Sequence, residues 1–139
     1  METTLSPYLT FDGNAAEAMQ FYQSVFGGEL STQTFGEVGM AESDVMKDKL
    51  VHASLESDAI TLMASDRSPE HSPPLKVGNN VNLSMNGSDK TALTEYFEKL
   101  SSGGKVTMPL EEQFWGDIFG MCEDKFGIRW MVNISQSGE

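Results

Sequence analysis

The chain has 139 residues, of which 39% are hydrophobic, and 21 acidic against 9 basic side chains give a formal net charge of −12. This length suits one domain with a real core, and an acidic surface repels nucleic-acid phosphates and anionic lipid. We therefore expect neither nucleic acid nor a membrane as a partner. The excess acid would attract cationic small molecules, or it simply keeps the protein soluble.

The single cysteine, Cys122, excludes an internal disulfide framework and suits a reducing compartment. No apolar run approaches the roughly 18 residues that a membrane span requires. The first four residues contain an acid and no base, which is unlike a secretory signal. These features predict a cytoplasmic protein.

The chain opens with a predicted strand over Leu5–Phe11, which ends in an Asp12-Gly13 turn. Asn14, with Glu17 three residues later, predicts a helix N-cap and a capping box. The apolar face of this helix is then formed by Ala18, Phe21, Tyr22, Val25 and Phe26. Gly27-Gly28 ends the helix, because glycine readily adopts the left-handed cap conformation.

Three more strands complete this half, at Glu29–Phe35, Leu50–Glu56 and Ala59–Ser65. A tight Ser57-Asp58 turn is expected between the last two. Residues 38–49 have no clear period and predict a mobile loop. Residues 67–79, which include His71, are rich in proline and polar side chains and predict a linker.

The second half repeats this order of elements. Val81–Met85 predicts a strand with an Asn86-Gly87 turn, and Ser88 and Asp89 are the candidate helix N-caps. The helix face consists of Ala92, Leu93, Tyr96, Phe97 and Leu100. Gly103-Gly104 ends the helix, 76 residues after the first glycine pair. The remaining strands are Lys105–Glu111, Gly116–Glu123 and Ile128–Ile134, the last two joined by a turn over residues 124–127.

The duplication predicts an α+β fold of two βαβββ repeats, with the first half at about 1–66 and the second at about 80–139. A sheet with one helix leaves its other face uncovered, so two such sheets can form an open concave trough within one domain. Concave surfaces of this kind are where small molecules bind.

Three segments carry a family resemblance, PYLTFDGNAAEAMQFYQSVFGGEL, LVHASLESDAITLMASD and FWGDIFGMCEDKFGIRWMVN. They resemble the PhnB-like branch of the vicinal oxygen chelate superfamily, which includes glyoxalase I, fosfomycin-resistance enzymes, extradiol dioxygenases and bleomycin-resistance proteins. The resemblance covers nearly the whole chain and implies the same duplicated fold. It says less about activity, because this fold hosts several chemistries.

Metal-dependent members of the superfamily hold a divalent cation with His, Glu or Gln. The resemblance places the corresponding positions at Pro7, Asn82 and Met131, and the symmetry of the repeat adds Met63. A proline side chain donates nothing, and a thioether suits only soft ions such as cuprous copper. The sequence therefore predicts no metal and no other cofactor, and the two methionines are interpreted as core filling or as walls of an apolar pocket.

Strand alternation predicts that Trp130, Val132 and Ile134 pack under a helix, as do Val81, Leu83 and Met85. The opposite face would then be semi-polar and would carry Asn82, Ser84, Arg129, Met131 and Asn133. This face is equally consistent with a ligand pocket and with a surface that is solvated or covered by a second subunit.

Two further positions are candidates for contact with a ligand or substrate. His52 is a weak catalytic candidate, because histidine is the residue type most often used for proton transfer. In the loop 113–117, Trp115 could stack on a flat or cationic ligand while Asp117 pairs with its charge; the same loop could instead close the trough or contact a second subunit. Cys122, followed by two acids, is interpreted as an inert thiol.

Three functions follow from these features. The first is a metal-free protein of resistance type that binds a cationic or aromatic small molecule, works as a homodimer, and uses His52, Met63, Asn82, Ser84, Trp115, Asp117, Arg129 and Met131. The second is an enzyme that uses His52 with Asn82, Arg129 or Asp117. The third is a regulatory or interaction module without a ligand.

Overall fold

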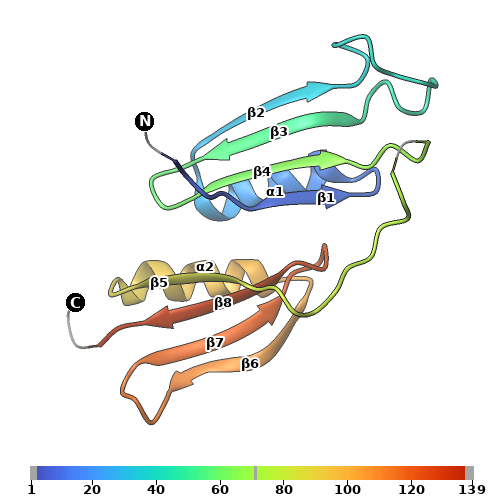
Figure 1. Cartoon of the computed structure of the whole chain (residues 1–139). Helices are drawn as coiled ribbons and strands as arrows, with labels where there is room; N and C mark the ends of the chain where they lie inside the picture. The colour runs from blue at the N-terminus through green and yellow to red at the C-terminus, as the bar shows by residue number, and fades with distance from the viewer. Residues whose placement is uncertain (1–2, 71, 137–139) are drawn as a thin grey trace. The chain divides into compact units, whose positions relative to one another are not determined.

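The computed structural model describes residues 3–70 and 72–136, so His71 of the predicted linker lies outside the described residues. The chain divides into two compact units, Met1–Lys76 and Val77–Glu139. The boundary falls inside the predicted linker 67–79. Each unit contains four strands and one helix in the same order (Figure 1).

The first unit is a four-stranded sheet with one helix. Its elements are β1 (Tyr8–Phe11), α1 (Ala15–Phe26), β2 (Glu29–Thr34), β3 (Leu50–Glu56) and β4 (Thr61–Asp66). The strand order is β1-β4-β3-β2, with β1 parallel to β4 and the other pairs antiparallel. Residues 35–49 form turns, bends and irregular backbone between β2 and β3, and they include the loop predicted over 38–49.

The second unit repeats this plan. Its elements are β5 (Leu83–Gly87), α2 (Lys90–Ser101), β6 (Lys105–Glu112), β7 (Ile118–Glu123) and β8 (Arg129–Ile134). The order is β5-β8-β7-β6, and again only the first pair is parallel. The predicted α+β class and the two βαβββ repeats are confirmed.

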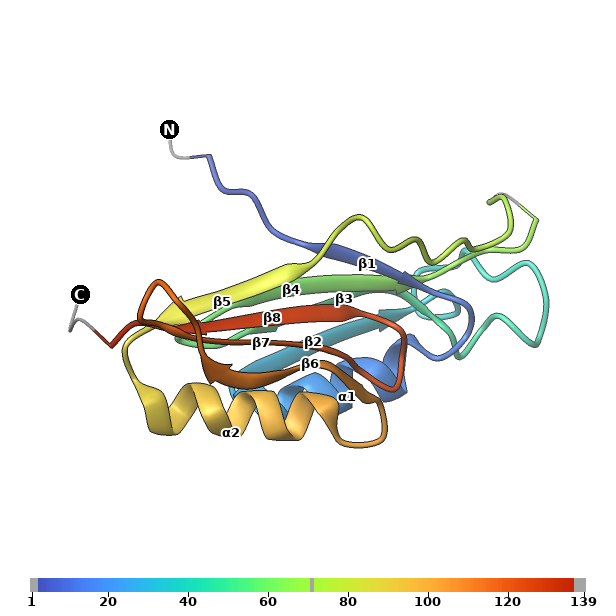
Figure 2. The same cartoon turned by 90° about the horizontal axis from the view of Figure 1, so that it is seen from below.

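Each helix covers one face of the sheet in its own unit (Figure 2). The buried residues of β8 are Trp130, Val132 and Ile134, which are at most 2% exposed and alternate with half-buried neighbours. This is the face predicted from strand alternation. In the first unit, β4 buries Leu62, Ala64 and Asp66 in the same way.

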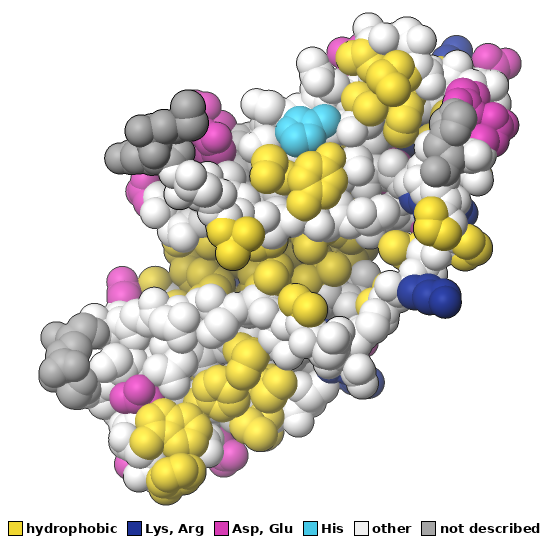
Figure 3. Space-filling view, in the orientation of Figure 1, with side chains coloured by type: hydrophobic (Ala, Val, Ile, Leu, Met, Phe, Trp, Pro, Cys, Tyr) yellow, Lys and Arg dark blue, Asp and Glu magenta, His cyan; other side chains and the backbone are white. Residues whose placement is uncertain are grey.

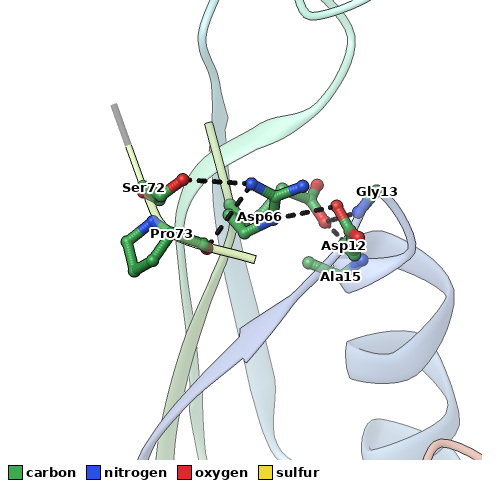
Figure 4. Close-up of polar contacts among 7 residues, drawn as sticks. Asp12, Gly13, Ala15, Asp66, Ser72 and Pro73 are labelled. Carbon is green, nitrogen blue, oxygen red and sulfur yellow. Dashed lines mark hydrogen bonds and ion pairs between the residues drawn. The ribbon is translucent and has the colours of Figure 1, made fainter. Parts of the chain in front are cut away.

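The start of α1 is capped differently from the prediction. Asn14 is the N-cap residue, but its side chain makes no capping hydrogen bond, so the predicted capping box is wrong. The cap is instead the carboxylate of Asp66 at the end of β4, which is 4% exposed and accepts from the backbone N–H groups of Gly13 and Ala15, each at 2.9 Å (Figure 4). The second oxygen of Asp66 accepts from the N–H of Leu50 at 2.9 Å. One buried carboxylate thus joins β4, α1 and the start of β3.

The helix α2 follows the prediction, since the side chain of Asp89 accepts from the N–H of Ala92 at 3.0 Å. Beside the first cap, Nε of Arg67 lies 3.3 Å from a carboxylate oxygen of Asp12, and Nη1 donates to the carbonyl of Ser72 at 3.2 Å (Figure 4). Arg67 therefore attaches the start of the linker to the turn before α1.

Four further local predictions were wrong. Val81 lies before β5 and is 70% exposed instead of packed inward, and Asn82 also precedes the strand. Asn86 and Gly87 belong to β5 and do not form a turn, because their partners in β8 extend the pairing. The turn between β3 and β4 is wider than two residues, since the N–H of Ser57 donates to the carbonyl of Ile60.

The fourth concerns α1, where Phe21 is only half-buried. The core face of this helix is formed by Ala15, Ala18, Met19, Tyr22, Val25 and Phe26.

Candidate functional site

Each sheet has a second face that the helix of its unit does not cover, and we call it the helix-free face. Strand alternation places every second side chain there, since successive side chains point to opposite faces. Most side chains of this face on β4 and β8 are half-buried, among them Met63 and Met131. A functional site on either unit is most readily built on this face, because the other is filled by core packing.

In the first unit, the helix-free face carries His52 on β3 and Tyr8 on the edge strand β1. The phenol oxygen of Tyr8 lies 3.3 Å from Nδ1 of His52, and the two ring centroids are 5.8 Å apart. Figure 3 looks onto this face and shows the histidine beside hydrophobic side chains. Met63 is paired with Tyr8 across β1 and β4. The structure therefore brings two predicted residues, His52 and Met63, together with Tyr8.

In the second unit, three methionines from neighbouring strands lie side by side on the helix-free face. Met108 of β6 is paired with Met121 of β7, and Met121 is paired with Met131 of β8. We call Met108, Met121 and Met131 the methionine row. Ser84 of β5 continues the row as the partner of Met131.

The duplication provides an internal comparison for the methionine row. In the first unit the corresponding row is Tyr8, Met63, Ser54 and Ser31, by the same strand pairing. The fold therefore accepts serine where the second unit has Met121 and Met108. Two of these methionines are thus not required for the sheet to form, although thioethers make an apolar and adaptable surface.

Three aromatic side chains lie together at the turn between β6 and β7 and at the start of β7. Phe114 is 97% exposed and Trp115 is 49% exposed. The ring centroid of Trp115 lies 5.0 Å from that of Phe114 and 6.0 Å from that of Phe119 on β7. We call Phe114, Trp115 and Phe119 the aromatic tip. Phe119 shares the face of the methionine row, because it lies two residues from Met121 on the same strand.

The carboxylates beside the aromatic tip are held by neutral amides. Asn133 donates to Asp117 at 3.0 Å, and the backbone N–H of Gln136 reaches the other oxygen of Asp117 at 3.4 Å. The side-chain amide of Gln136 donates to Glu112 at 3.0 Å and to the carbonyl of Gly116 at 2.9 Å. We call Asn133 and Gln136 the amide clamp. It fixes Asp117, so this carboxylate supports the turn, which the sequence did not predict.

The remaining predicted residues lie apart from the tip. Arg129 begins β8 and lies 3.7 Å from the carboxylate of Glu123 in a partly exposed ion pair. It is four residues from Asn133 on β8, or about 13 Å at the usual rise of a strand. Asn82 precedes β5 and is half-buried. In the second unit, Met131 therefore belongs to the methionine row and Ser84 lies next to it. Trp115 and Asp117 lie at the aromatic tip, whereas Arg129 lies at the opposite end of β8.

The metal that the superfamily implies can be tested against the residues at its positions. Pro7 lies next to Met63, since its carbonyl accepts from the Met63 N–H at 3.1 Å, but its ring has no donor atom. Strand pairing places Tyr8 beside Met63 and Ser84 beside Met131, so a shifted register adds only hydroxyl groups. Within residues 3–70 and 72–136, no three His, Cys, Asp or Glu side chains come together. These residues do not fit a hard divalent cation, which needs imidazole or carboxylate ligands.

Cys122 faces the core side of β7 and is 2% exposed. Burial, and then the negative charge of Asp124, raise the pKa of its thiol to about 11. Asp124 itself accepts from the indole N–H of Trp130 at 2.9 Å and from the N–H of Phe126 at 2.8 Å. Because the thiolate is the reactive form, this cysteine has the properties of an inert core residue.

Several site residues were missed by the sequence reasoning, namely Tyr8, Met108, Phe119, Met121 and Gln136. The alternation of residues 118–123 could have placed Phe119 and Met121 on one face with Met131. Nothing local marks Tyr8 or Gln136, because their partners are 44 and 24 residues away.

Comparison with known families now identifies the class of protein. The sequence model of the Glyoxalase/Bleomycin resistance protein/Dioxygenase superfamily matches residues 4–132. The chain belongs to this superfamily, as the resemblance of its segments predicted.

Three known proteins are similar to this chain over nearly its whole length. Protein YjdN of Escherichia coli is 30% identical over 141 residues, which cover 94% of each chain. The structure of protein PA1353 from Pseudomonas aeruginosa is 38% identical with a TM-score of 0.85, covering 96% of this chain and 98% of that one. The PhnB protein from Bacillus cereus, at 24% identity and a TM-score of 0.74 over 96% of this chain and 100% of that one, shares the fold.

Neither helix in the described part of the chain has the length and hydropathy needed to cross a membrane.

Proposed function

We propose that this protein binds a small aromatic or cationic molecule on the helix-free face of its second unit, without a hard divalent metal. The methionine row carries the proposal, because the first unit has serines at two of the same positions and folds alike. Large apolar side chains left half-exposed where the fold accepts polar ones are typical of binding surfaces. Unbranched thioethers adapt to ligands of different shape.

The other predicted site residues take definite roles in this proposal. Ser84 and Met131 contact the body of the ligand beside Met121, and Trp115 stacks against it at one end. Asp117 acts by holding the turn through the amide clamp. Asn82 and Arg129 are proposed as further contacts on the same unit, of which Arg129 is already paired with Glu123. Met63 and His52 lie in the first unit, where contact with a ligand stays a prediction.

A thermal-shift screen with flat aromatic compounds tests the proposal. A ligand present at 100 times its dissociation constant adds about 2.7 kcal/mol to the free energy of unfolding. Met121→Ser should weaken the binding of any hit about tenfold, because burying a methionine side chain is worth about 1.5–3 kcal/mol. Met40→Ser, at a methionine 59% exposed in the loop between β2 and β3, is the matched control. Equal affinities of the two variants would refute this assignment of the surface.

The alternative function is an enzyme that uses His52. One observation favours it, since the phenol of Tyr8 lies 3.3 Å from Nδ1 of His52 and can fix the orientation of the imidazole ring. Once a substrate is known, a full turnover rate in His52→Ala would eliminate this alternative.

We also propose that the protein is a cytoplasmic homodimer. A lone buried cysteine suits a reducing compartment. The edge strands β2 and β6 leave backbone groups available for pairing with a second copy. Light scattering coupled to size-exclusion chromatography tests the dimer, and a monomer at micromolar concentration would refute it.

A further inference from the structure

We infer that the aromatic tip selects an organic cation, whose charged group lies at the tip while its apolar body lies along the methionine row. This inference rests on the proposed function and specifies the ligand class and its orientation on the same face. The expected ligand is a planar compound with a quaternary or protonated nitrogen.

The rings provide the surface. Trp115 is 49% exposed and its centroid is 6.0 Å from Phe119, with the two planes at 63°. Phe114 meets Trp115 edge to face, with planes at 88°. An indole face is the strongest aromatic partner for a cation, and such contacts reach within about 6 Å of the ring centroid.

Acidic side chains give the aromatic tip a negative charge. Glu111, Glu112 and Asp117 lie in the segment 111–119, which contains no lysine or arginine. Glu111 is directly paired with Phe119 across β6 and β7, so the two side chains leave the sheet on the same side. Within the described residues, neither Glu111 nor its two acidic neighbours forms an ion pair. A cation is the complementary partner for exposed aromatic rings beside acidic side chains.

The amide clamp makes the tip rigid without neutralising it. Asn133 and Gln136 hold Asp117 and Glu112 with neutral donors at 3.0 Å. A lysine or arginine at these positions would hold the carboxylates equally well but would cancel their charge. Gln136 and Asn133 are therefore positioning residues that preserve the negative charge and preorganise the rings for a ligand.

Calorimetric titration with N-methylquinolinium and with quinoline tests the inference. The two compounds have similar flat bodies, but only the first is a cation at pH 7.5. We expect the cation to bind about tenfold more tightly, because a ring contact and a neighbouring carboxylate each contribute up to about fivefold at an exposed site. The preference should decrease with added salt.

Variants separate the tip from the rest of the face. Glu111→Gln should weaken binding of the cation about threefold and leave quinoline unchanged, whereas Glu98→Gln on the exposed side of α2 should change neither. Equal binding of the two compounds, with Glu111→Gln without effect, would overturn the inference and leave the proposed function intact. If neither compound binds, the binding function of this face fails for flat ligands and the inference fails with it.

Discussion

Replacing Asp66 with alanine should lower the free energy of unfolding by about 4 kcal/mol. The carboxylate is 4% exposed and accepts three backbone hydrogen bonds at 2.9 Å, from Gly13, Ala15 and Leu50. Hydrogen bonds to charged groups are worth about 1.5–3 kcal/mol, and two of these donors are buried without access to water after the substitution. We take a value near the lower end for each bond, because the Gly13 donor is only partly buried.

The cap of the second helix is the matched control. Asp89 makes one capping bond, to Ala92 at 3.0 Å, at an exposed helix start. Asp89→Ala should therefore cost about 1 kcal/mol, which is the usual value for an N-cap. Asp66→Asn should fall between the two, because its oxygen can still serve Gly13 and Ala15 while its amide nitrogen cannot accept from Leu50.

Urea unfolding followed by far-ultraviolet circular dichroism and by tryptophan fluorescence measures these differences. Both tryptophans, Trp115 and Trp130, lie in the second unit, so fluorescence follows that unit and circular dichroism follows both. Coincident transitions would indicate one cooperative domain, as the sequence predicts. A loss in Asp66→Ala no larger than that in Asp89→Ala would refute the reasoning that the buried, shared carboxylate determines the difference.

Three further predictions concern the second unit. The pKa of Cys122, raised to about 11, should leave the thiol unreactive towards iodoacetamide at pH 8 until the protein is unfolded, and rapid labelling of the native protein would contradict this. Because the thiol ionises at lower pH in the unfolded state, the free energy of unfolding should fall as pH rises from about 9 to 11. This fall should be smaller in Cys122→Ala. Gly120→Ala should cost about 2 kcal/mol in urea unfolding, since a Cβ there would lie 2.9 Å from Cα of Leu110 and 3.0 Å from the ring of Phe97, whereas Gly78→Ala should be neutral. Gln136→Ala should weaken N-methylquinolinium binding about threefold in calorimetry, with little loss of stability because the bonds of the amide clamp are exposed. Gln20→Ala is the control. An affinity of Gln136→Ala equal to that of Gln20→Ala would show that the clamp does not position the tip.

The sequence was most informative where the chain repeats itself. Two glycine pairs 76 residues apart, each after an amphipathic segment, predicted both helices, and alternation predicted the buried face of β8. Local signals failed at the ends of helices and strands. Asn86 and Gly87 have the composition of a turn, but pairing with β8 extends β5 through them. Asn14 has the composition of a cap, but Asp66 from a distant strand occupies its role.

The sequence alone therefore determined the duplicated α+β architecture and showed that Pro7, Met63, Asn82 and Met131 make a poor set of ligands for a hard cation. Helical and strand periods and side-chain chemistry are local properties, so they can be read without coordinates. Only the tertiary structure decided which side chains share a site. The methionine row joins three strands, and the amide clamp joins Gln136 to Glu112 across 24 residues. Such neighbours depend on strand register, which long-range packing sets and no local pattern specifies.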